Sequence, residues 1–94
     1  MAVLIELRAI FSGRVQGVGF RYRIVELAEQ LSLKGEVKNL RDGSVELRAV
    51  GSRSDLEKFL QTLKAHPGRA QIESIKKEFL MTPSHYTSFN ISFD

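Results

Sequence analysis

The spacing of apolar residues changes several times along this 94-residue chain, and the order of the changes limits the folds that it can adopt. Residues 3–11 alternate between apolar and polar side chains, which predicts a strand with one covered face. Glu6 and Arg8 lie on the opposite, open face. From Phe20 to Leu31 the apolar residues recur at helical spacing, so an amphipathic helix is expected there. The predicted covered face of the strand consists of Val3, Ile5, Leu7, Ala9 and Phe11.

The middle of the chain has the pattern of a β-hairpin. Gly35 is the expected end of the first helix, because glycine is common just after a helix C-terminus. Residues 36–41 and 44–50 follow as two predicted strands, joined through Asp42-Gly43. The Asp-Gly pair is among the strongest short-range hairpin signals, since both positions tolerate a positive φ.

A second helix and two further strands complete the pattern. The segment from Ser54 to Glu57 has the form of a capping box, and apolar residues follow at helical spacing as far as Leu63. Pro67-Gly68 is the expected end of this helix, and strands are predicted at 71–79 and 89–93. The order βαββαβ with a short terminal strand favours an α+β, ferredoxin-like sandwich, in which two helices cover one face of an antiparallel sheet.

The composition narrows the chemistry that the chain can perform. Residues 1–94 are expected to form one domain, and they contain no cysteine for a disulfide, a thiolate metal site or a nucleophile. His66 and His85 have no ligand spacing, so neither a metal nor another cofactor is expected.

The charge and the apolar runs indicate which partners to expect. The net charge of +3 is spread evenly over both halves, without the basic stripe that is typical of a nucleic-acid binder. No apolar run approaches the roughly 20 residues of a membrane span, and the start has no signal-peptide pattern. We therefore expect a cytoplasmic monomer that binds neither nucleic acid nor a membrane.

The segment between the first strand and the first helix has the pattern of an anion-binding loop. Its three glycines permit backbone conformations that point successive N–H groups into one concavity. The helix that begins at Phe20 adds the unpaired N–H groups of its first turn and the positive end of its dipole. Arg21 in that turn can bind two phosphate oxygens at once, although a plain connection is the alternative for such a loop taken alone. The predicted cradle consists of Gly13, Arg14, Val15, Gln16, Gly17, Val18 and Gly19.

Two long motifs resemble the signatures of the acylphosphatase family. Gly13 to Arg21 match the first signature, G-x-V-Q-G-V-x-[FM]-R, throughout. The second signature is G-aromatic-[AVC]-[KRQ]-N, three residues, G-x-V, five residues and G. The matching residues are Gly35, Val37, Lys38, Asn39, Gly43, Val45 and Gly51. The chain departs from the pattern at Phe11, where an aliphatic residue is usual, and at Glu36, where an aromatic one is usual.

The resemblance implies hydrolysis of the carboxylic–phosphoric anhydride of an acyl phosphate, with a carboxylate and inorganic phosphate as products. It further implies that Arg21 binds the phosphate, that Asn39 orients the attacking water, and that loop N–H groups cradle the phosphoryl oxygens. The family needs no metal and forms no phosphoenzyme. The chemistry agrees, because a carboxylate leaves without a strong general acid and a neutral amide can hold a water in line.

Two other functions are compatible with the pattern. A ferredoxin-like sheet can serve as a non-catalytic binding module for RNA or for a phosphorylated ligand. RNA modules of this kind carry exposed aromatic residues on the sheet, whereas Phe11 falls on the covered face. Similar domains also open a large hydrogenase-maturation protein that handles carbamoyl phosphate. A stand-alone enzyme is the expectation here, since the first predicted strand follows Met1 closely.

Overall fold

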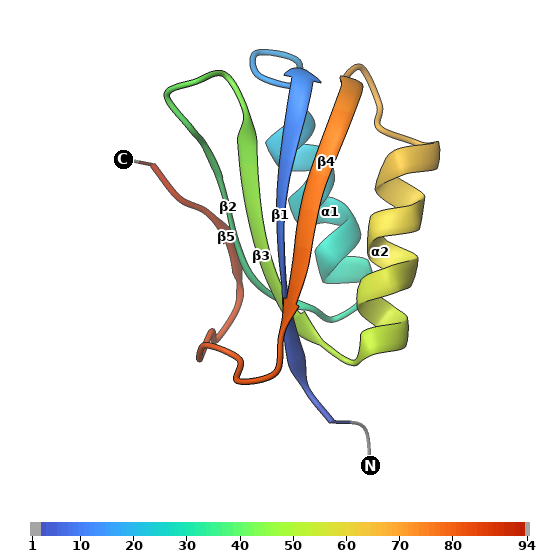
Figure 1. The fold of residues 1–94 in the computed structure, drawn as a ribbon, viewed down its shortest axis with the longest axis vertical. Helices are drawn as coiled ribbons and strands as arrows, with labels where there is room; N and C mark the ends of the chain where they lie inside the picture. The colour runs from blue at the N-terminus through green and yellow to red at the C-terminus, as the bar shows by residue number, and fades with distance from the viewer. Residues whose placement is uncertain (1–2, 94) are drawn as a thin grey trace.

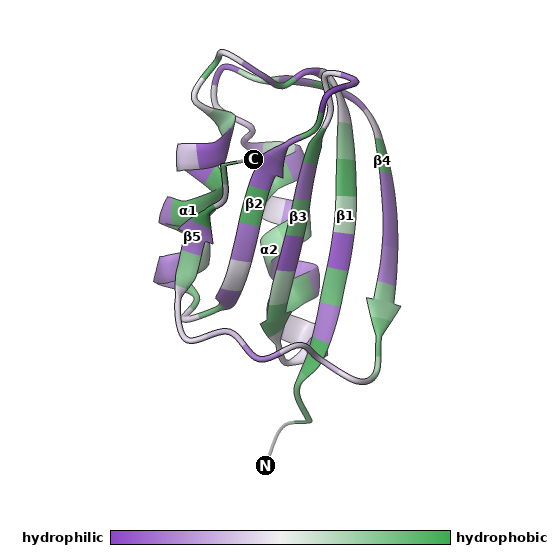
Figure 2. Ribbon diagram, turned by 90° about the vertical axis from the view of Figure 1, so that its left-hand side faces the viewer, coloured by the Kyte–Doolittle hydropathy of each residue, from purple (hydrophilic) through white to green (hydrophobic). Residues whose placement is uncertain are grey.

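In the computed structural model, which describes residues 3–93, a single five-stranded sheet carries two helices on one face (Figure 1). The elements in chain order are β1 (Ile5–Arg14), α1 (Phe20–Gln30), β2 (Lys34–Asn39), β3 (Val45–Gly51), α2 (Arg53–Ala65), β4 (Gln71–Leu80) and β5 (Phe89–Ile91). The strands lie in the order β4-β1-β3-β2-β5, with both helices on the far side in Figure 2. The predicted α+β, ferredoxin-like sandwich is confirmed.

The last strand departs from the predicted antiparallel sheet. β1 pairs antiparallel with β3 and β4, and β2 pairs antiparallel with β3, but β5 runs parallel to β2. The cause is the segment 81–88, which crosses the end of the sheet from β4 at one edge to β5 at the other (Figure 2). After this crossing the chain runs in the same direction as β2, so the sheet is mixed.

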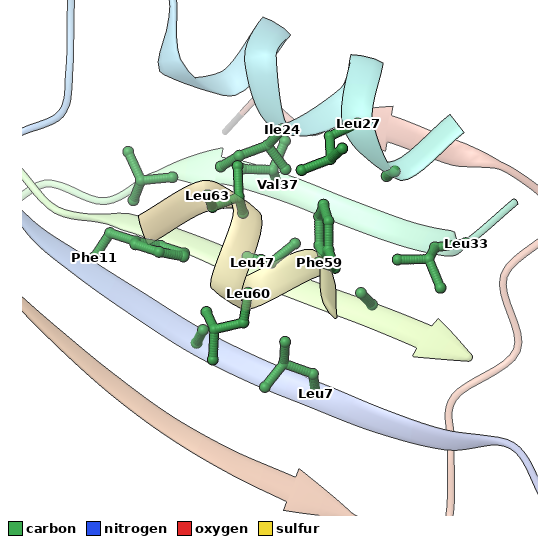
Figure 3. Close-up of a cluster of buried hydrophobic side chains, with 14 of the residues drawn as sticks. Leu7, Phe11, Ile24, Leu27, Leu33, Val37, Leu47, Phe59, Leu60 and Leu63 are labelled. Atoms are coloured by element: carbon green, nitrogen blue, oxygen red, sulfur yellow. The ribbon is translucent and has the colours of Figure 1, made fainter. Parts of the chain in front are cut away.

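The core lies between the sheet and the helices, where both helical stripes meet the covered face of the strands (Figure 3). The predicted alternation of β1 holds for Ile5, Leu7, Ala9 and Phe11, whose side chains are buried. Val3 precedes β1 and is 73% exposed, so the predicted strand begins two residues too early. Phe11 packs edge to face against Phe20, with ring centroids 5.2 Å apart, and this contact ties the end of β1 to the start of α1.

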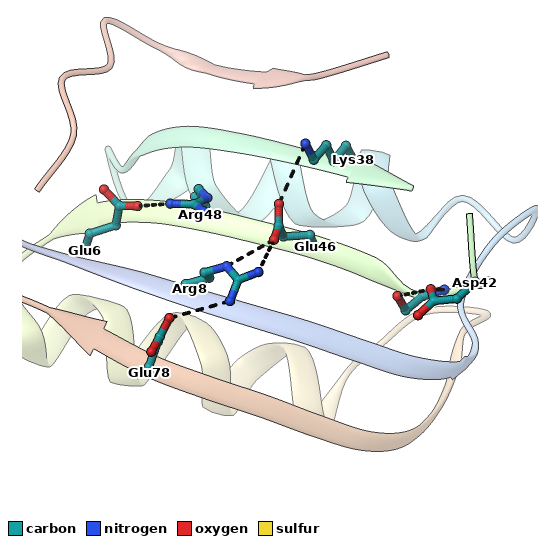
Figure 4. A network of polar contacts seen from close by, with 8 residues as sticks. Glu6, Arg8, Lys38, Asp42, Glu46, Arg48 and Glu78 are labelled. Carbon is teal, nitrogen blue, oxygen red and sulfur yellow. Dashed lines mark hydrogen bonds and ion pairs between the residues drawn. The ribbon is translucent and has the colours of Figure 1, made fainter. Parts of the chain in front are cut away.

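The open face of the sheet carries a network of ion pairs (Figure 4). Arg8 on β1 binds Glu46 on β3, with 2.8 Å between Nη2 and Oε2. Glu6, which the alternation places on the open face, is nevertheless fully buried. Its carboxylate accepts hydrogen bonds from the backbone N–H of Ser84 (2.8 Å) and from Nη1 of Arg48 (3.1 Å). The crossing segment thus packs on this face, which a pattern local to β1 could not reveal.

Helix α1 ends earlier than predicted, in a turn built on serine instead of glycine. Ser32 has a left-handed φ of 56°, and the N–H groups of Ser32 and Leu33 donate to carbonyls in the last turn of the helix. Gly35, the predicted helix end, lies within β2. A Cβ there would come within 1.9 Å of the Arg48 carbonyl oxygen, so the close approach of β2 to β3 requires glycine.

Helix α2 begins with a different cap from the one predicted. The N-cap is Ser52, whose Oγ accepts a hydrogen bond from the N–H of Asp55 at 3.2 Å. Ser54, the predicted cap, lies in the first turn of the helix. Both serines stand three residues before an acidic residue, and the structure selects Ser52 because β3 ends at Gly51, directly before it.

Candidate active site

The glycine-rich segment divides into the end of a strand and a short loop. β1 continues through Gly13 and Arg14, which pair with Ile72 and Gln71 of β4. The register of this pairing shifts immediately before Gly13, where a Cβ would lie 2.3 Å from the Gln71 carbonyl oxygen. Glycine at this position therefore lets the two strands approach. The loop itself consists of residues 15–19.

Buried contacts hold the loop at both ends. Val15 at its start and Phe20 after its end are both buried in the core. Between them, the Gln16 side chain reaches the β2–β3 hairpin, where Nε2 donates to the carbonyls of Leu40 (2.8 Å) and Ser44 (2.9 Å). The sequence predicted Gln16 only as part of the cradle, because its side-chain contacts depend on where the hairpin folds.

Gly17 and Gly19 leave the backbone of the loop open. Both are exposed and have left-handed φ values of 73° and 77°, and apart from the adjacent residues no described residue comes within 4 Å of where a Cβ would be. Gly19 is the N-cap of α1 and has no side chain, so the first-turn N–H groups receive no side-chain cap. The positive end of the helix dipole is therefore presented beside the loop.

Arg21 and Asn39, the two predicted catalytic residues, line one hollow of about 400 Å³. Arg21 lies in the first turn of α1, and Asn39 is the last residue of β2. The start of α1, the end of β2 and the C-terminal segment lie at the same end of the molecule as the loop (Figure 1). The remaining lining residues are Leu40, Arg41, Ser92 and Phe93.

Three other hollows of the described surface lack the combination of a guanidinium and a side-chain amide; in one of about 190 Å³ the Arg8 guanidinium is present, but no amide lines it. One of about 600 Å³ lies at the opposite end of β2, with Lys34 and Tyr86 in its wall. Another of about 340 Å³ is lined by α2 and β4, with Leu60 and Ile75 in its wall. Neither is lined by a guanidinium or by a side-chain amide. Chemistry and not size therefore identifies the hollow of Arg21 and Asn39 as the candidate site.

Asn39 offers an unused hydrogen-bond acceptor in this region. Its Oδ1 atom is buried and accepts no hydrogen bond from the residues at positions 3–93. Buried side-chain oxygens normally have a donor, so an unpaired one is typical of a position that meets a ligand or a water. The backbone of Asn39 is fixed by its pairing with Val45 of β3. A water molecule reaches this oxygen only when the amide turns toward the hollow, where Oδ1 can accept a hydrogen from it.

Arg21 contacts an aromatic ring that the sequence did not connect with it. No carboxylate within residues 3–93 forms an ion pair with its guanidinium. Its Cζ atom lies over the ring of Phe93, 5.2 Å from the ring centroid. The alternation at the end of the chain predicted Phe93 as part of the last strand, but β5 ends at Ile91 and Phe93 lies beyond it. Local spacing carries no signal for this contact with α1.

The turn that follows Asn39 is fixed by Asp42. The hydroxyl and the N–H of Ser44 donate to its Oδ1 atom, and these bonds hold the pKa of the Asp42 carboxyl below its usual value. Gly43 has a left-handed φ of 94°, whereas Asp42 does not, and the Gly43 N–H donates to the Leu40 carbonyl. The connection between β2 and β3 therefore spans residues 40–44 and is longer than the two-residue turn that the Asp-Gly pair predicted. Since carbonyl groups of this turn accept the Gln16 amide, the turn also helps to place the glycine loop.

Two structural features are absent from residues 3–93. No group of three or more His, Cys, Asp or Glu side chains in this range is arranged to hold a metal ion. No helix there is long and apolar enough to span a membrane.

Comparisons with known proteins agree with one another. The family model for acylphosphatase matches residues 7–91. An acylphosphatase of Archaeoglobus fulgidus is 40% identical over 90 residues, covering 96% of this chain and 100% of that protein. One of Treponema denticola is 44% identical over 85 residues, covering 90% and 89%. The crystal structure of acylphosphatase from Bacillus subtilis is similar with a TM-score of 0.90 and 34% identity, over 95% of this chain and 99% of that one. Full-length HypF is similar with a TM-score of 0.86 and 26% identity, over 96% of this chain but 12% of that one.

Proposed function

This chain belongs to the acylphosphatase family, and we propose that it hydrolyses acyl phosphates to a carboxylate and inorganic phosphate by means of Arg21, Asn39 and the glycine loop. The observation that carries this proposal is the common hollow of Arg21 and Asn39 at the loop end of the sheet. Every group that the mechanism needs comes from one chain, so a monomer suffices for activity.

The loop and Arg21 bind the phosphoryl group in this proposal. N–H groups of residues 15–19 and of the first turn of α1 donate to its oxygens, and Arg21 adds two parallel hydrogen bonds. The exposed backbone at Gly17 and Gly19 supports this role, because no Cβ obstructs the approach. An arginine at a helix N-terminus costs about 0.3–1 kcal/mol against the dipole, and a bound phosphate offsets this cost.

Asn39 positions the nucleophile. When its amide turns from the buried position toward the hollow, Oδ1 accepts one hydrogen of a water molecule, whose oxygen then faces the phosphorus. The water oxygen forms the new bond to phosphorus as the bond to the acyl oxygen breaks, and the acyl group leaves as a carboxylate. One proton of the water passes to a phosphate oxygen of the substrate, so no side-chain base is needed. The protein acts by positioning and charge stabilisation, which is what phosphoryl transfer mainly requires.

The direct test is an ultraviolet assay with an aryl acyl phosphate such as benzoyl phosphate, run with a chelator present. The wild-type chain should hydrolyse it well above the background rate. Asn39→Ala should lose about 10²–10³-fold in turnover, as is typical for one preorganised hydrogen-bonding group. Arg21→Ala should lose more because it also weakens binding, and Arg21→Lys should not restore it because lysine lacks the bidentate fork.

A matched control separates these effects from general damage. Asn90 is an exposed amide on β5, so Asn90→Ala removes the same group outside the hollow and should leave turnover unchanged. Activity no higher than background, or full activity in both Arg21→Ala and Asn39→Ala, would contradict the proposed function.

The RNA-binding alternative has little support on the sheet. Its open face carries the ion pairs of Arg8 with Glu46 and of Arg48 with Glu6, and these occupy the surface on which RNA bases would stack (Figure 4). Salt-dependent binding of a single-stranded RNA oligomer with no hydrolysis of benzoyl phosphate would favour that alternative.

A further inference from the structure

The C-terminal segment reaches the candidate site through β2. Ile91 on β5 pairs with Val37 on β2, and the N–H of Ser92 donates to the Val37 carbonyl at 2.8 Å. Two residues after Val37 the same strand carries Asn39. These backbone bonds place Phe93, the next residue, in the wall of the hollow beside Arg21.

Phe93 is a surface residue in terms of packing, yet it makes a specific contact. Its side chain is 74% exposed, so the ring adds little to the core. It nevertheless lies under the guanidinium of Arg21, with Cζ 5.2 Å from the ring centroid, which is within the range of a cation–π interaction. An exposed ring kept over a cation is better explained by an effect on the cation than by the burial of apolar surface.

The chemistry of the contact suits a phosphate-binding arginine. A carboxylate partner would occupy N–H donors of the guanidinium and neutralise its charge. The face of an aromatic ring attracts the cation through its quadrupole, so the N–H donors stay available for phosphate oxygens. It also limits the positions that a long, flexible side chain can adopt before substrate arrives.

We propose that Phe93 is a positioning residue, whose ring holds the Arg21 guanidinium where it receives the phosphoryl group. This inference rests on the proposed function, since it concerns the phosphate-binding role of Arg21. It adds the C-terminal segment to the elements that build the site. It also gives a role to the exposed ring of Phe93, which lies beyond the last strand.

The test compares Phe93→Leu, Phe93→Tyr and the wild-type chain. An exposed cation–π contact contributes about 0.5–1 kcal/mol, so Phe93→Leu should raise the inhibition constant of inorganic phosphate and the KM about two- to five-fold. The kcat should change less, because the lost interaction acts in substrate binding as well as in the transition state. Phe93→Tyr keeps the ring and should restore both constants.

Phe79→Leu is the matched control, because Phe79 lies under another guanidinium, that of Arg53 (Cζ 4.2 Å from the ring centroid), and does not line the hollow of Arg21. This variant should leave the phosphate constant unchanged. The thermal midpoint of Phe93→Leu should also stay near that of the wild type, since its side chain is largely exposed. An unchanged phosphate constant in Phe93→Leu, a failure of Phe93→Tyr to restore it, or an equal effect of Phe79→Leu would each overturn the proposal.

A second measurement does not depend on catalysis. The Nε–H resonance of Arg21 can be followed by NMR during a titration with inorganic phosphate. Phe93→Leu should shift this resonance in the free protein, because the ring current is lost, and should weaken phosphate binding by the same two- to five-fold. In an Arg21→Ala background, Phe93→Leu should have no further effect on phosphate binding; a persisting effect would refute a role through Arg21. If the chain hydrolyses no acyl phosphate, this titration still decides the role of Phe93.

Discussion

Replacing Gln16 by alanine tests whether the loop is held in place by the β2–β3 hairpin. The substitution removes the two hydrogen bonds from Nε2 to the carbonyls of Leu40 and Ser44. Both carbonyls keep a backbone donor, because Gly43 N–H bonds to Leu40 O and Leu40 N–H bonds to Ser44 O. The free energy of unfolding should therefore fall by the net contribution of two hydrogen bonds, about 2 kcal/mol in total, because no acceptor is left without a donor. For a domain of this size that lowers the thermal midpoint by about 8–16 °C.

The same substitution should reduce activity at temperatures where the protein is fully folded. The loop would lose its connection to the hairpin that follows Asn39, and a small displacement of a positioning group can cost up to about 10²-fold in rate. We expect the kcat/KM of Gln16→Ala for benzoyl phosphate to fall about 10–100-fold at 20 °C. Gln61→Ala, on the exposed surface of α2, is the control for loss of a glutamine side chain and should alter neither quantity.

Gln16→Glu is a second test of the contact between the loop and the β2–β3 hairpin. At pH 7 its carboxylate can only accept hydrogen bonds, yet it would face the two carbonyl oxygens of Leu40 and Ser44. This raises the pKa of the new carboxyl in the folded state, so the variant should be less stable than Gln16→Ala at pH 7 and should recover as the pH falls toward 4. Equal midpoints for Gln16→Ala, Gln61→Ala and the wild type would falsify the anchoring role.

Three other substitutions test the frame around the site. Gly35→Ala should lower the free energy of unfolding, measured with urea, by more than about 3 kcal/mol, because its Cβ would overlap the carbonyl oxygen of Arg48. A decrease below about 1 kcal/mol would mean that β2 and β3 can separate at little cost. Glu6→Ala should lower the free energy of unfolding by less than the roughly 3–5 kcal/mol typical of a fully buried ion pair, since Arg48 is partly exposed and can be rehydrated. An unchanged free energy of unfolding in urea would contradict a stabilising role of this pair. Asp42→Ala should be less stable than the wild type above about pH 4, and the difference should shrink as acid protonates Asp42 in the wild type. The reason is that the Ser44 hydrogen bonds, which lower the pKa of this carboxyl, contribute stability only while it is ionised. A difference in thermal midpoint that does not depend on pH would contradict this.

The sequence predicted the parts of the fold that depend on local pattern. The helical spacing after Phe20 corresponds to α1, and the Asp42-Gly43 pair marks the β2–β3 hairpin, although the strands are joined through residues 40–44 and not through this pair alone. The two signatures pointed to Arg21 and Asn39, and both side chains line one hollow, while their catalytic roles stay a prediction. These elements are specified over a few residues, so a linear pattern suffices to find them.

The contacts between distant elements could not be predicted in the same way. Ser32 takes the left-handed position that glycine was expected to fill, because Leu33 must enter the core directly after the helix. The burial of Glu6 depends on Ser84, which lies 78 residues away in the sequence. The bonds of Gln16 to the hairpin and the contact of Phe93 with Arg21 likewise join separate segments. Each of them requires a tertiary arrangement that periodicity does not encode.

The β2 strand is the common support of the candidate site. It carries Asn39 at its end, its hairpin accepts the Gln16 amide, and its Val37 carbonyl holds the segment before Phe93. A displacement of β2 would therefore move Asn39, the loop and the wall of the hollow beside Arg21 together. This arrangement explains why the second motif begins with a glycine remote from the chemistry. Gly35 lets β2 lie close against β3, and that approach sets the position of every group attached to β2.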